Sequence, residues 1–302
     1  MPKHDNLAAL VIPVHNRKQF TMACLDRLGW VAAESGWKII IVDDGSTDGT
    51  GTAVREFHPH VEVVDGDGDL YWTGAMVKGM QRAVHMGARQ IVWLNDDTHP
   101  NEASLRRIVS LVRENPKHII ASCAWADGQP LATGSRKRQP VLPAPGELAA
   151  ADVLAGFQVA FSTQVMEAIG FPDPTRWPHY AGDSGFTRRA HNAGFQLFLD
   201  GGSRIDLCDH PDTIDVGEIF WGGKEDLAAK TRRTFFNKNA RYRLASRWHL
   251  DCLFRGVLVS IMVFPARCAL WLVKILLHRN KARATGIATV GVGAPEIHST
   301  RI

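Results

Sequence analysis

The sequence predicts an α/β protein whose central sheet is mostly parallel and flanked by helices. The first observation is a set of four short apolar runs rich in Ile, Val and Leu, as strands buried on both faces are. The second is that a segment long enough for a helix separates each run from the next, which indicates right-handed crossovers. The runs lie at residues 7–14, 37–42, 61–64 and 90–94.

A polar cluster follows each of these runs. Because the carboxyl ends of parallel strands lie on one edge of a sheet, we expect the clusters to converge on one crevice, where open α/β sheets bind ligands. Carboxylates in such a crevice repel a bare phosphate unless a divalent cation intervenes. The sequence therefore predicts a metal together with a phosphorylated ligand. The clusters are His15-Asn16-Arg17, Asp43-Asp44-Gly45-Ser46, residues 65–69 and Asn95-Asp96-Asp97.

The remaining elements follow from periodicity and from residues that start or stop helices. Asn115-Pro116 stops a helix over residues 102–114. Residues 128–147 are rich in Pro, Gly and basic side chains, which predicts an irregular excursion. Further helices are expected after Asn16, after Thr50, at 73–85 and at 183–192, and further strands at 118–123, 153–162 and 195–199.

Bulk composition places the chain among globular proteins. Its 302 residues can bury a large core, and 45% hydrophobic with 22% charged residues are ordinary globular values. Five cysteines without a CxxC pair or a metal-ligand spacing predict free buried thiols in a reducing cytoplasm. An apolar strand begins after only six residues, so no signal peptide is expected.

The segment from Leu253 to Leu277 is strongly apolar but contains Arg and Lys, and Pro265 should kink it. Its uninterrupted apolar stretch, residues 256–266, is shorter than the about 20 residues that span a bilayer. We expect a helix lying in the membrane interface, with Trp248 and Trp271 near the headgroups and basic residues toward anionic lipid. The alternative is a helix buried in an oligomer interface or against the sheet.

The two acidic clusters point to different parts of one ligand. Asp43 or Asp44, just after a strand, can accept a hydrogen bond from a base N–H or a ribose hydroxyl; the structural alternative is an Asx-turn leading into a helix cap. Asn95 and Asp97 lie two residues apart and point the same way in an extended turn. Their oxygens suit Mg²⁺ or Mn²⁺, whereas the alternative is a cap for the helix near Asn101.

Three motifs together resemble the successive signatures of family 2 glycosyltransferases with the GT-A fold. They are Val11-Ile12-Pro13-Val14-His15-Asn16-Arg17, residues 42–50 and Asn95-Asp96-Asp97. The resemblance covers about residues 6–215 and is strongest for the bacterial branch of rhamnosyltransferase-like enzymes. It implies a GT-A domain at 1–223, with a nucleotide-sugar half at about 1–123 and an acceptor half at about 124–223. A helical membrane-associating region at 224–281 and a disordered tail at 282–302 would follow.

The resemblance also implies roles for individual residues. Asp97 and Asn95 would hold the metal, although Asn95 replaces the first Asp of a strict DxD motif. The segment 69–79 resembles the family's Gly-rich donor segment, but Asp69 and Val77 stand where Asn is usual; its small residues also suit simple helix packing. The nucleotide-sugar-binding set is Pro13, His15, Asn16, Arg17, Asp43, Asp44, Trp72, Gly74, Lys78, Asn95 and Asp96.

On the acceptor side, residues 179–189 look like the family's acidic motif. Inversion needs a carboxylate that removes the acceptor hydroxyl's proton, and Asp183 is the residue of this segment able to do so at neutral pH. Gly185 stands where the family often has a second acid, and the alternative for Asp183 is a helix N-cap. Gly156 and Phe157 resemble the acceptor platform. His210 is a weaker metal candidate, since a His beside Pro is usually an ordinary loop residue.

These features predict an inverting, metal-dependent glycosyltransferase. It would move a sugar from a UDP- or dTDP-type donor to a glycan or lipid-linked glycan, in cell-surface polysaccharide or glycolipid assembly. We expect a cytoplasmic protein, peripheral to the inner face of the cytoplasmic membrane, that binds no nucleic acid. The alternatives are a non-catalytic membrane-associated scaffold with the same fold and a nucleotidyltransferase, which usually begins with a Gly-rich basic loop. No GxGxxG follows the first strand, so a Rossmann dehydrogenase is poorly supported.

Overall fold

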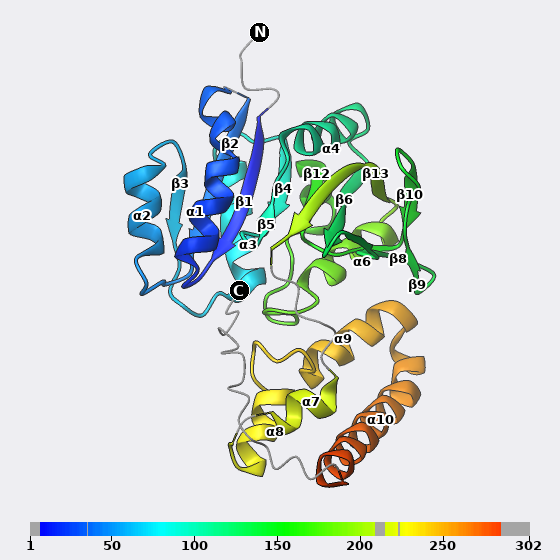
Figure 1. Cartoon of the computed structure of the whole chain (residues 1–302). Coiled ribbons are helices and arrows are strands. Elements are labelled where there is room, and N and C mark those ends of the chain that lie inside the picture. The colour runs from blue at the N-terminus through cyan, green and yellow to red at the C-terminus, as the bar shows by residue number, and fades with distance from the viewer. Residues whose placement is uncertain (1–6, 35, 209–214, 223, 285–302) are drawn as a thin grey trace.

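The computed structural model describes residues 7–34, 36–208, 215–222 and 224–284. It consists of an α/β domain and, below it in Figure 1, a helical unit formed by the last four helices. The expected disordered tail falls mainly on residues 285–302, and His210 on residues 209–214; both lie outside the described residues.

The nucleotide half has the predicted parallel order. Strand β1 (Ala8–Val14) pairs in parallel with β2 (Trp37–Asp43) and β4 (Gln90–Leu94), and β2 pairs in parallel with β3 (Glu62–Asp65). All seven residues of β1 are buried, because helices cover both faces of this sheet. These helices are α1 (Lys18–Arg27), α2 (Thr50–Phe57), α3 (Tyr71–His85) and α4 (Glu102–Glu114), with the short 3₁₀ helix Gly29–Ala33 after α1.

The acceptor half makes the sheet mixed. Strand β12 (Gln158–Ser162) runs antiparallel between β4 and β6 (His118–Ala126), and β13 (Gln196–Leu207) pairs in parallel with β6. Strand β10 (Leu148–Ala151) closes this edge, while β5 (Thr98–His99) and β7 (Gln129–Leu131) pair with β13 and β6. The predicted fold class, a mostly parallel central sheet flanked by helices, is confirmed for the nucleotide half, and the acceptor half makes the whole sheet mixed.

Two details of the predicted elements were wrong. Residues 128–147 are not irregular, because β8 (Gly134–Arg136) and β9 (Gln139–Val141) form a small sheet with β11 (Val153–Leu154). The expected strand at 153–162 is two strands, β11 and β12, separated by residues 155–157. Helix α5 (Thr163–Ile169) follows β12, and α6 (Gly182–Asn192) begins one residue before its predicted start.

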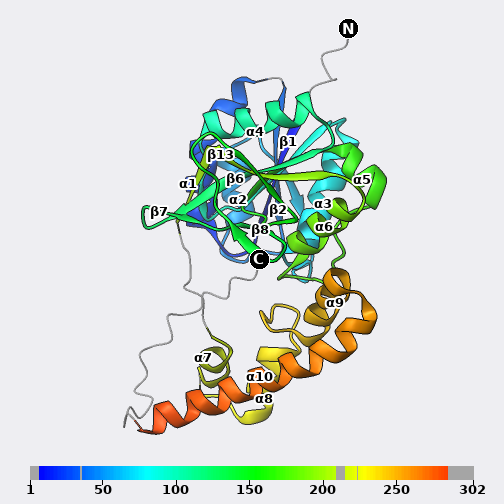
Figure 2. The same cartoon turned by 90° about the vertical axis from the view of Figure 1, so that its right-hand side faces the viewer.

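The helical unit has its own small core. Helices α7 (Val216–Trp221), α8 (Leu227–Phe235) and α9 (Leu244–Arg255) pack with α10 (Val257–Ala284) around Phe220 and Trp271. Trp271 is therefore buried and does not lie at a headgroup, contrary to expectation. Arg267 and Arg255 also turn inward, where both pair with Asp251. Figure 2 shows α10 crossing beneath the α/β domain, away from the sheet.

The cysteines agree only in part with the expectation of buried thiols. All five are free, but Cys24 and Cys123 are buried, Cys252 and Cys268 are partly exposed, and Cys208 is exposed.

Candidate functional site

The four polar clusters meet at the carboxyl edge of β1, β2, β3 and β4. The His15 ring contacts the backbone carbonyl of Asp44 through Nδ1 at 2.5 Å. Asn16, at φ +54°, accepts hydrogen bonds from the backbone N–H groups of Thr47 and Asp48, and its own N–H donates to Ser46 Oγ. The loops after β1 and β2 thus form one hydrogen-bonded unit.

Asp44 organises the loop between β3 and α3. One carboxylate oxygen accepts from Gly68 N–H at 2.8 Å, and the other accepts from Leu70 and Tyr71 N–H at 3.0 and 2.9 Å. Tyr71 adopts φ +54°, a left-handed conformation rare outside glycine, to reach this carboxylate. Asp43 accepts one bond, from Ser46 N–H at 3.0 Å. Asp43 therefore keeps more of its accepting capacity for another partner.

The Asn95-Asp96-Asp97 cluster divides between the interior and the crevice. Buried Asp96 accepts from Arg17 Nε and from Thr21 Oγ1, both at 2.9 Å, so it anchors the turn to α1. Burial raises the pKa of Asp96, and the ion pair with Arg17 opposes that rise. Asp97 is partly exposed, and its Oδ2 lies 3.2 Å from Arg17 Nη2. Arg17 thus bridges the two carboxylates.

A chain of contacts crosses the site. It runs from Asn95 through Trp72 and Gly156 to Asp183. The Trp72 indole N–H donates to Asn95 Oδ1 at 2.9 Å. The Trp72 ring lies so close to Gly156 that a Cβ there would be 2.9 Å from it. Gly156 N–H in turn donates to Asp183 Oδ2 at 2.8 Å. Trp72 therefore separates the proposed metal loop from the proposed base and contacts the neighbours of both.

Asp183 is the second residue of α6 and is half-buried. Its other oxygen accepts from the Ser184 backbone N–H at 2.6 Å. Burial raises the pKa of Asp183, and the hydrogen bonds from Ser184 and Gly156 oppose this effect. A carboxylate held by two N–H groups with a raised pKa is a stronger proton acceptor than an exposed Asp.

Gly185 is a packing position in this chain. A Cβ at Gly185 would lie 2.7 Å from the ring of Trp177, which is 1% exposed. Trp177 also donates its indole N–H to the carbonyl of Ser246, at 3.0 Å, in helix α9. Trp177 therefore leaves no room for an acidic side chain at position 185. The same tryptophan joins the loop before α6 to the helical unit.

The other predicted residues lie near this edge in different ways. Pro13 is buried in β1, opposite Val42. Gly74, in the first turn of α3, approaches Leu70 and Pro174. Lys78 Nζ donates to the Asp65 carbonyl at 2.7 Å. The Phe157 carbonyl accepts from Asn95 N–H at 3.2 Å, so the acceptor platform is tied to the metal loop.

Few protein oxygens are available for a metal. Among the described residues no group of three or more His, Cys, Asp or Glu side chains is arranged to hold one. Asp97 offers a partly exposed carboxylate, while Asn95 Oδ1 already accepts from Trp72. This donor set fits a cation that takes one or two protein carboxylates and fills its shell with diphosphate oxygens and water, as Mg²⁺ does. Asp97, with Asn95, would hold it.

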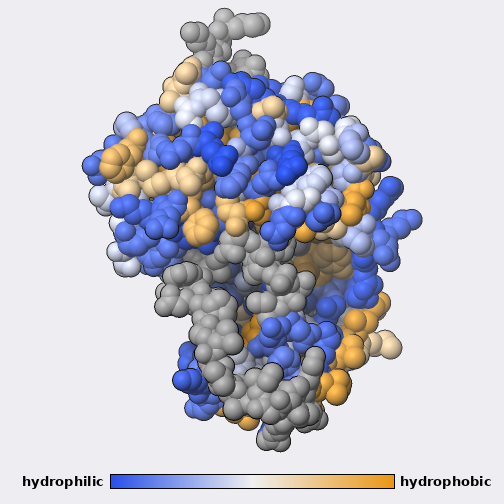
Figure 3. Space-filling view, in the orientation of Figure 1, coloured by the Kyte–Doolittle hydropathy of each residue, from blue (hydrophilic) through white to orange (hydrophobic). Residues whose placement is uncertain are grey.

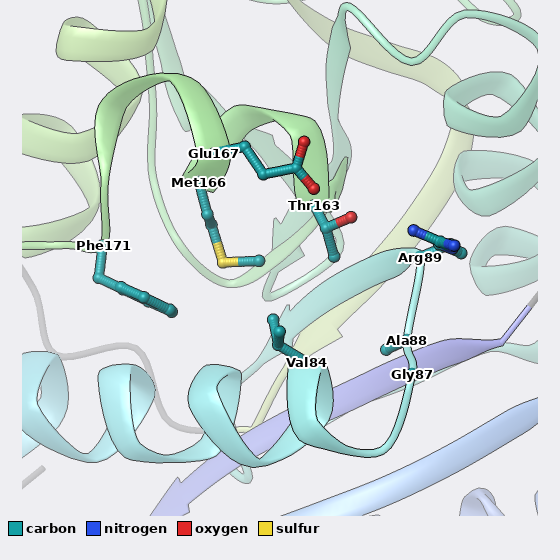
Figure 4. A pocket seen from close by; sticks show the side chains of 8 residues that line it. All are labelled: Val84, Gly87, Ala88, Arg89, Thr163, Met166, Glu167 and Phe171. Carbon is teal, nitrogen blue, oxygen red and sulfur yellow. The ribbon is translucent and has the colours of Figure 1, made fainter.

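An apolar pocket of about 460 Å³ lies elsewhere. Figure 4 shows it between the end of α3 and helix α5, with Arg89 at the start of β4 and Glu167 on α5. These residues lie at the opposite edge of the sheet from Asn95, at the other end of β4. The pocket is therefore separate from the site just described.

Sequence reasoning missed two residues that support the site. Thr21 fixes Asp96, and its signal was its position one helical turn after Arg17, the N-cap of α1. Trp177 packs against Gly185, two residues after Asp183. No local sequence signal indicated this contact.

Comparisons with known proteins agree with this geometry. Residues 9–189 match the model of the glycosyl transferase family 2. Similar solved structures are S. aureus TarS 1–349 (TM-score 0.55, 11% identity, 92% of each chain covered) and the mannosyltransferase PcManGT from Pyrobaculum calidifontis with GDP-Man and Mn²⁺ (0.51, 13%, 92% and 86%).

GalNAc-T7 with UDP, GalNAc and Mn²⁺ is also similar (0.55, 14% identity, 80% of this chain), and the chain spans 50% of that protein. No curated protein matches this chain in sequence. The family match covers more than half of the 302 residues and includes every motif at the carboxyl edge of the sheet. The chain therefore belongs to glycosyl transferase family 2.

Proposed function

We propose that this protein transfers a sugar from a nucleoside-diphosphate sugar to an acceptor hydroxyl, with inversion at the anomeric carbon. The observation that carries the proposal is the path from the Asn95–Asp97 turn through Trp72 and Gly156 to Asp183. Along this path a candidate proton acceptor would lie across one indole ring from a candidate diphosphate site.

The donor would lie against the loops after β1, β2 and β3, with its base or ribose at Asp43 and Asp44 and its diphosphate near Asp97. TarS has been crystallised with UDP and with UDP-GlcNAc, and PcManGT with GDP-Man, which supports a nucleotide-sugar donor. We propose a UDP- or dTDP-sugar. Bound Mg²⁺ or Mn²⁺ would neutralise charge growing on the leaving diphosphate.

Asp183 would act as the general base. Its backbone hydrogen bonds fix the carboxylate in one position, and its burial favours proton uptake. Arg17 would keep Asp97 oriented through the Asp96 pair. Trp72 would exclude water between donor and acceptor and so disfavour hydrolysis of the donor.

We further propose that the helical unit attaches the enzyme to the cytoplasmic face of a membrane, where it glycosylates a glycan or lipid-linked glycan. Residues 257–279 form a helix long and apolar enough to cross a bilayer. In its most apolar stretch of 18 residues, 17% of the residues are buried. Leu258 and Met262 are 82% and 78% exposed. Figure 3 shows an orange strip along the lower right edge, the side on which α10 lies in the same view in Figure 1.

A peripheral position suits this helix better than burial against the sheet. Its buried residues Trp271 and Ile275 pack on α7, so the helix is not covered by the sheet. Arg267 and Lys274 are both paired with carboxylates, Asp251 and Asp215, of the helical unit. The unit could then rest on the bilayer without burying an unpaired charge in it. We place the enzyme with the rhamnosyltransferase-like branch of surface-polysaccharide assembly.

The direct test is a screen of nucleotide sugars for metal-dependent hydrolysis and for thermal stabilisation. We expect a UDP- or dTDP-sugar to raise the melting temperature in the presence of Mn²⁺ and to be turned over, and EDTA to abolish turnover. Stabilisation by UDP or dTDP without turnover of any sugar would favour a non-catalytic scaffold instead. Two observations favour the scaffold. Trp72 already donates to Asn95 Oδ1, and Trp177 leaves no room for an acidic side chain at position 185.

A further inference from the structure

Several arginines lie where the helical unit contacts the loop before α6. Arg241, in the loop before α9, lies 5.9 Å from the ring centroid of Tyr180, three residues before Asp183. Arg247, on α9, donates two hydrogen bonds to the Arg241 carbonyl at 2.8 and 3.2 Å. Arg267, on α10, is near enough to Arg247 for their charges to repel. We name Arg241, Arg247 and Arg267 the arginine cluster.

The positive charge of the arginine cluster exceeds the negative charge of the carboxylate beside it, Asp251. Over the described ranges, neither Arg241 nor Arg247 forms an ion pair with Asp or Glu within 4 Å. Asp251 lies nearby, but it pairs with Arg267 at 2.7 Å and with Arg255 at 3.5 Å. Arg267 Nε is buried without a hydrogen-bond partner in the part of the chain described.

Burial adds to the cost of this arrangement. It lowers the pKa of Arg247, and the charges of Arg267 and Arg241 lower it further, while Tyr242 and Asp251 oppose the change. Buried like charges are costly unless an anion compensates them. Planar guanidinium groups match phosphate oxygens in pairs, which makes phosphate the favoured anion.

The cluster lies between two surfaces of different chemistry. On one side Tyr180 leads through Ala181 into the first turn of α6, which carries Asp183. On the other side Arg267 belongs to α10, whose outer face exposes Met262 and Leu270. A molecule occupying both sides would be apolar at one end, anionic in the middle and hydroxylated at the end near Asp183.

We propose that the arginine cluster binds the phosphate or diphosphate group of a lipid-linked glycan acceptor. This inference rests on the proposed function, since it names the acceptor class of that reaction. It assigns to the helical unit a part in acceptor recognition as well as in membrane attachment. The phosphate would fix how far the glycan reaches toward Asp183, and so select the sugar hydroxyl that is presented.

The test uses the full chain and two soluble probes, farnesyl diphosphate and farnesol, in calorimetry with saturating UDP and Mn²⁺ to occupy the donor site. We expect Arg241→Gln, and more strongly Arg241→Gln with Arg247→Gln, to weaken binding of the diphosphate by about 10- to 100-fold, the effect of losing charged hydrogen bonds. Farnesol should bind much more weakly, because it lacks the anion. Equal affinity for the diphosphate in wild type and double variant overturns the proposal.

Two controls make the result specific. Arg232→Gln removes an exposed positive charge from α8 of the same unit and should leave diphosphate affinity unchanged. Arg247→Lys keeps the charge and one donor to the Arg241 carbonyl, so it should retain most of the affinity lost in Arg247→Gln. Arg232→Gln weakening the diphosphate as much as Arg241→Gln would show a nonspecific charge effect and contradict the site.

A further experiment distinguishes binding of the acceptor from binding of ordinary membrane lipid. Sedimentation with phosphatidylglycerol vesicles should be little changed in the double variant. If the double variant instead loses vesicle binding and keeps its affinity for farnesyl diphosphate, the cluster binds lipid headgroups and the acceptor assignment is wrong. Turnover by the wild type with unchanged diphosphate binding in the variants would refute this site alone. Diphosphate binding through the cluster with no nucleotide-sugar turnover would refute the proposed function alone.

Discussion

Replacing Asp183 with Asn separates a role as base from a structural role of its carboxylate. The alternative of a helix cap is wrong, because the N-cap of α6 is Ala181. The carboxylate accepts from Gly156 N–H at 2.8 Å and from Ser184 N–H at 2.6 Å. Asn has one carbonyl oxygen and an NH₂ group, so one of these N–H groups loses its acceptor. The expected cost is about 1–3 kcal/mol in the free energy of unfolding, partly offset because a buried charge is removed.

The rate effect should be larger than this stability effect. A positioned general base contributes about 10²–10⁴ to the rate, which is about 2.7–5.4 kcal/mol at 1.36 kcal/mol per tenfold. Affinity for UDP should change little, since its proposed contacts lie in the nucleotide half. The assay measures kcat for sugar transfer by folded protein, with calorimetric UDP affinity and the melting temperature as companions.

The pH dependence gives a second readout of the same residue. The base must be deprotonated, and burial raises the pKa of Asp183 above its ordinary value of 3.8. Wild-type kcat/KM should therefore fall as pH drops through a pKa higher than that of an exposed Asp, and Asp183→Asn should lose this limb. A transfer rate in Asp183→Asn near that of wild type would refute the base role and leave only the structural role of accepting from Gly156 and Ser184.

Asp173→Asn is a matched control for this substitution. Asp173 also accepts two backbone N–H bonds, from Thr175 and Arg176, both at 3.0 Å, and lies in the same acceptor half. Both bonds reach one oxygen, Oδ1, which Asn can supply, so this variant loses the charge of a carboxylate and should change little in stability or rate. A rate loss as large as that of Asp183→Asn would mean that loop order, not proton transfer, limits turnover.

Three further outcomes are expected. Asp97→Ala should abolish Mn²⁺-dependent turnover and the added thermal stabilisation by Mn²⁺ with UDP; full activity in EDTA would contradict the metal role. Gly156→Ala should lower both kcat and the melting temperature, because its Cβ would lie 2.9 Å from the Trp72 ring. Gly29→Ala, where a Cβ meets nothing within 4 Å, should be neutral, and equal losses in both would remove the steric argument. Met262→Glu should weaken sedimentation with anionic vesicles severalfold without destabilising the fold, since Met262 is 78% exposed; unchanged sedimentation would point to an oligomer interface.

The nucleotide half could be predicted closely because its signals are local. Strand β4 and helix α4 have the predicted bounds, since a buried parallel strand is a continuous apolar run and Asn115-Pro116 ends a helix. The convergence of the polar clusters followed from the geometry of parallel strands alone.

What could not be predicted depends on contacts between distant segments. Sequence shows that Asp44 is acidic and follows a strand, but not that three N–H groups of residues 68–71 fill its carboxylate. It suggested Asn95 as a metal donor, but not that Trp72 donates to its oxygen. The expected position of Trp271 near headgroups was wrong because helical amphipathicity does not reveal which face meets a neighbouring helix.

The contact between Trp177 and Gly185 limits how this site can change. An acidic side chain at 185 and the indole at 177 require the same space, since even a Cβ would lie 2.7 Å from the ring. The indole is also bonded to Ser246 of the helical unit, so replacing Trp177 to admit an acid would loosen the attachment of α9. Restoring a second carboxylate beside Asp183 would thus require paired substitutions at 177 and 185. Either substitution alone would be harmful, and the two positions should vary together among relatives that keep this helical unit.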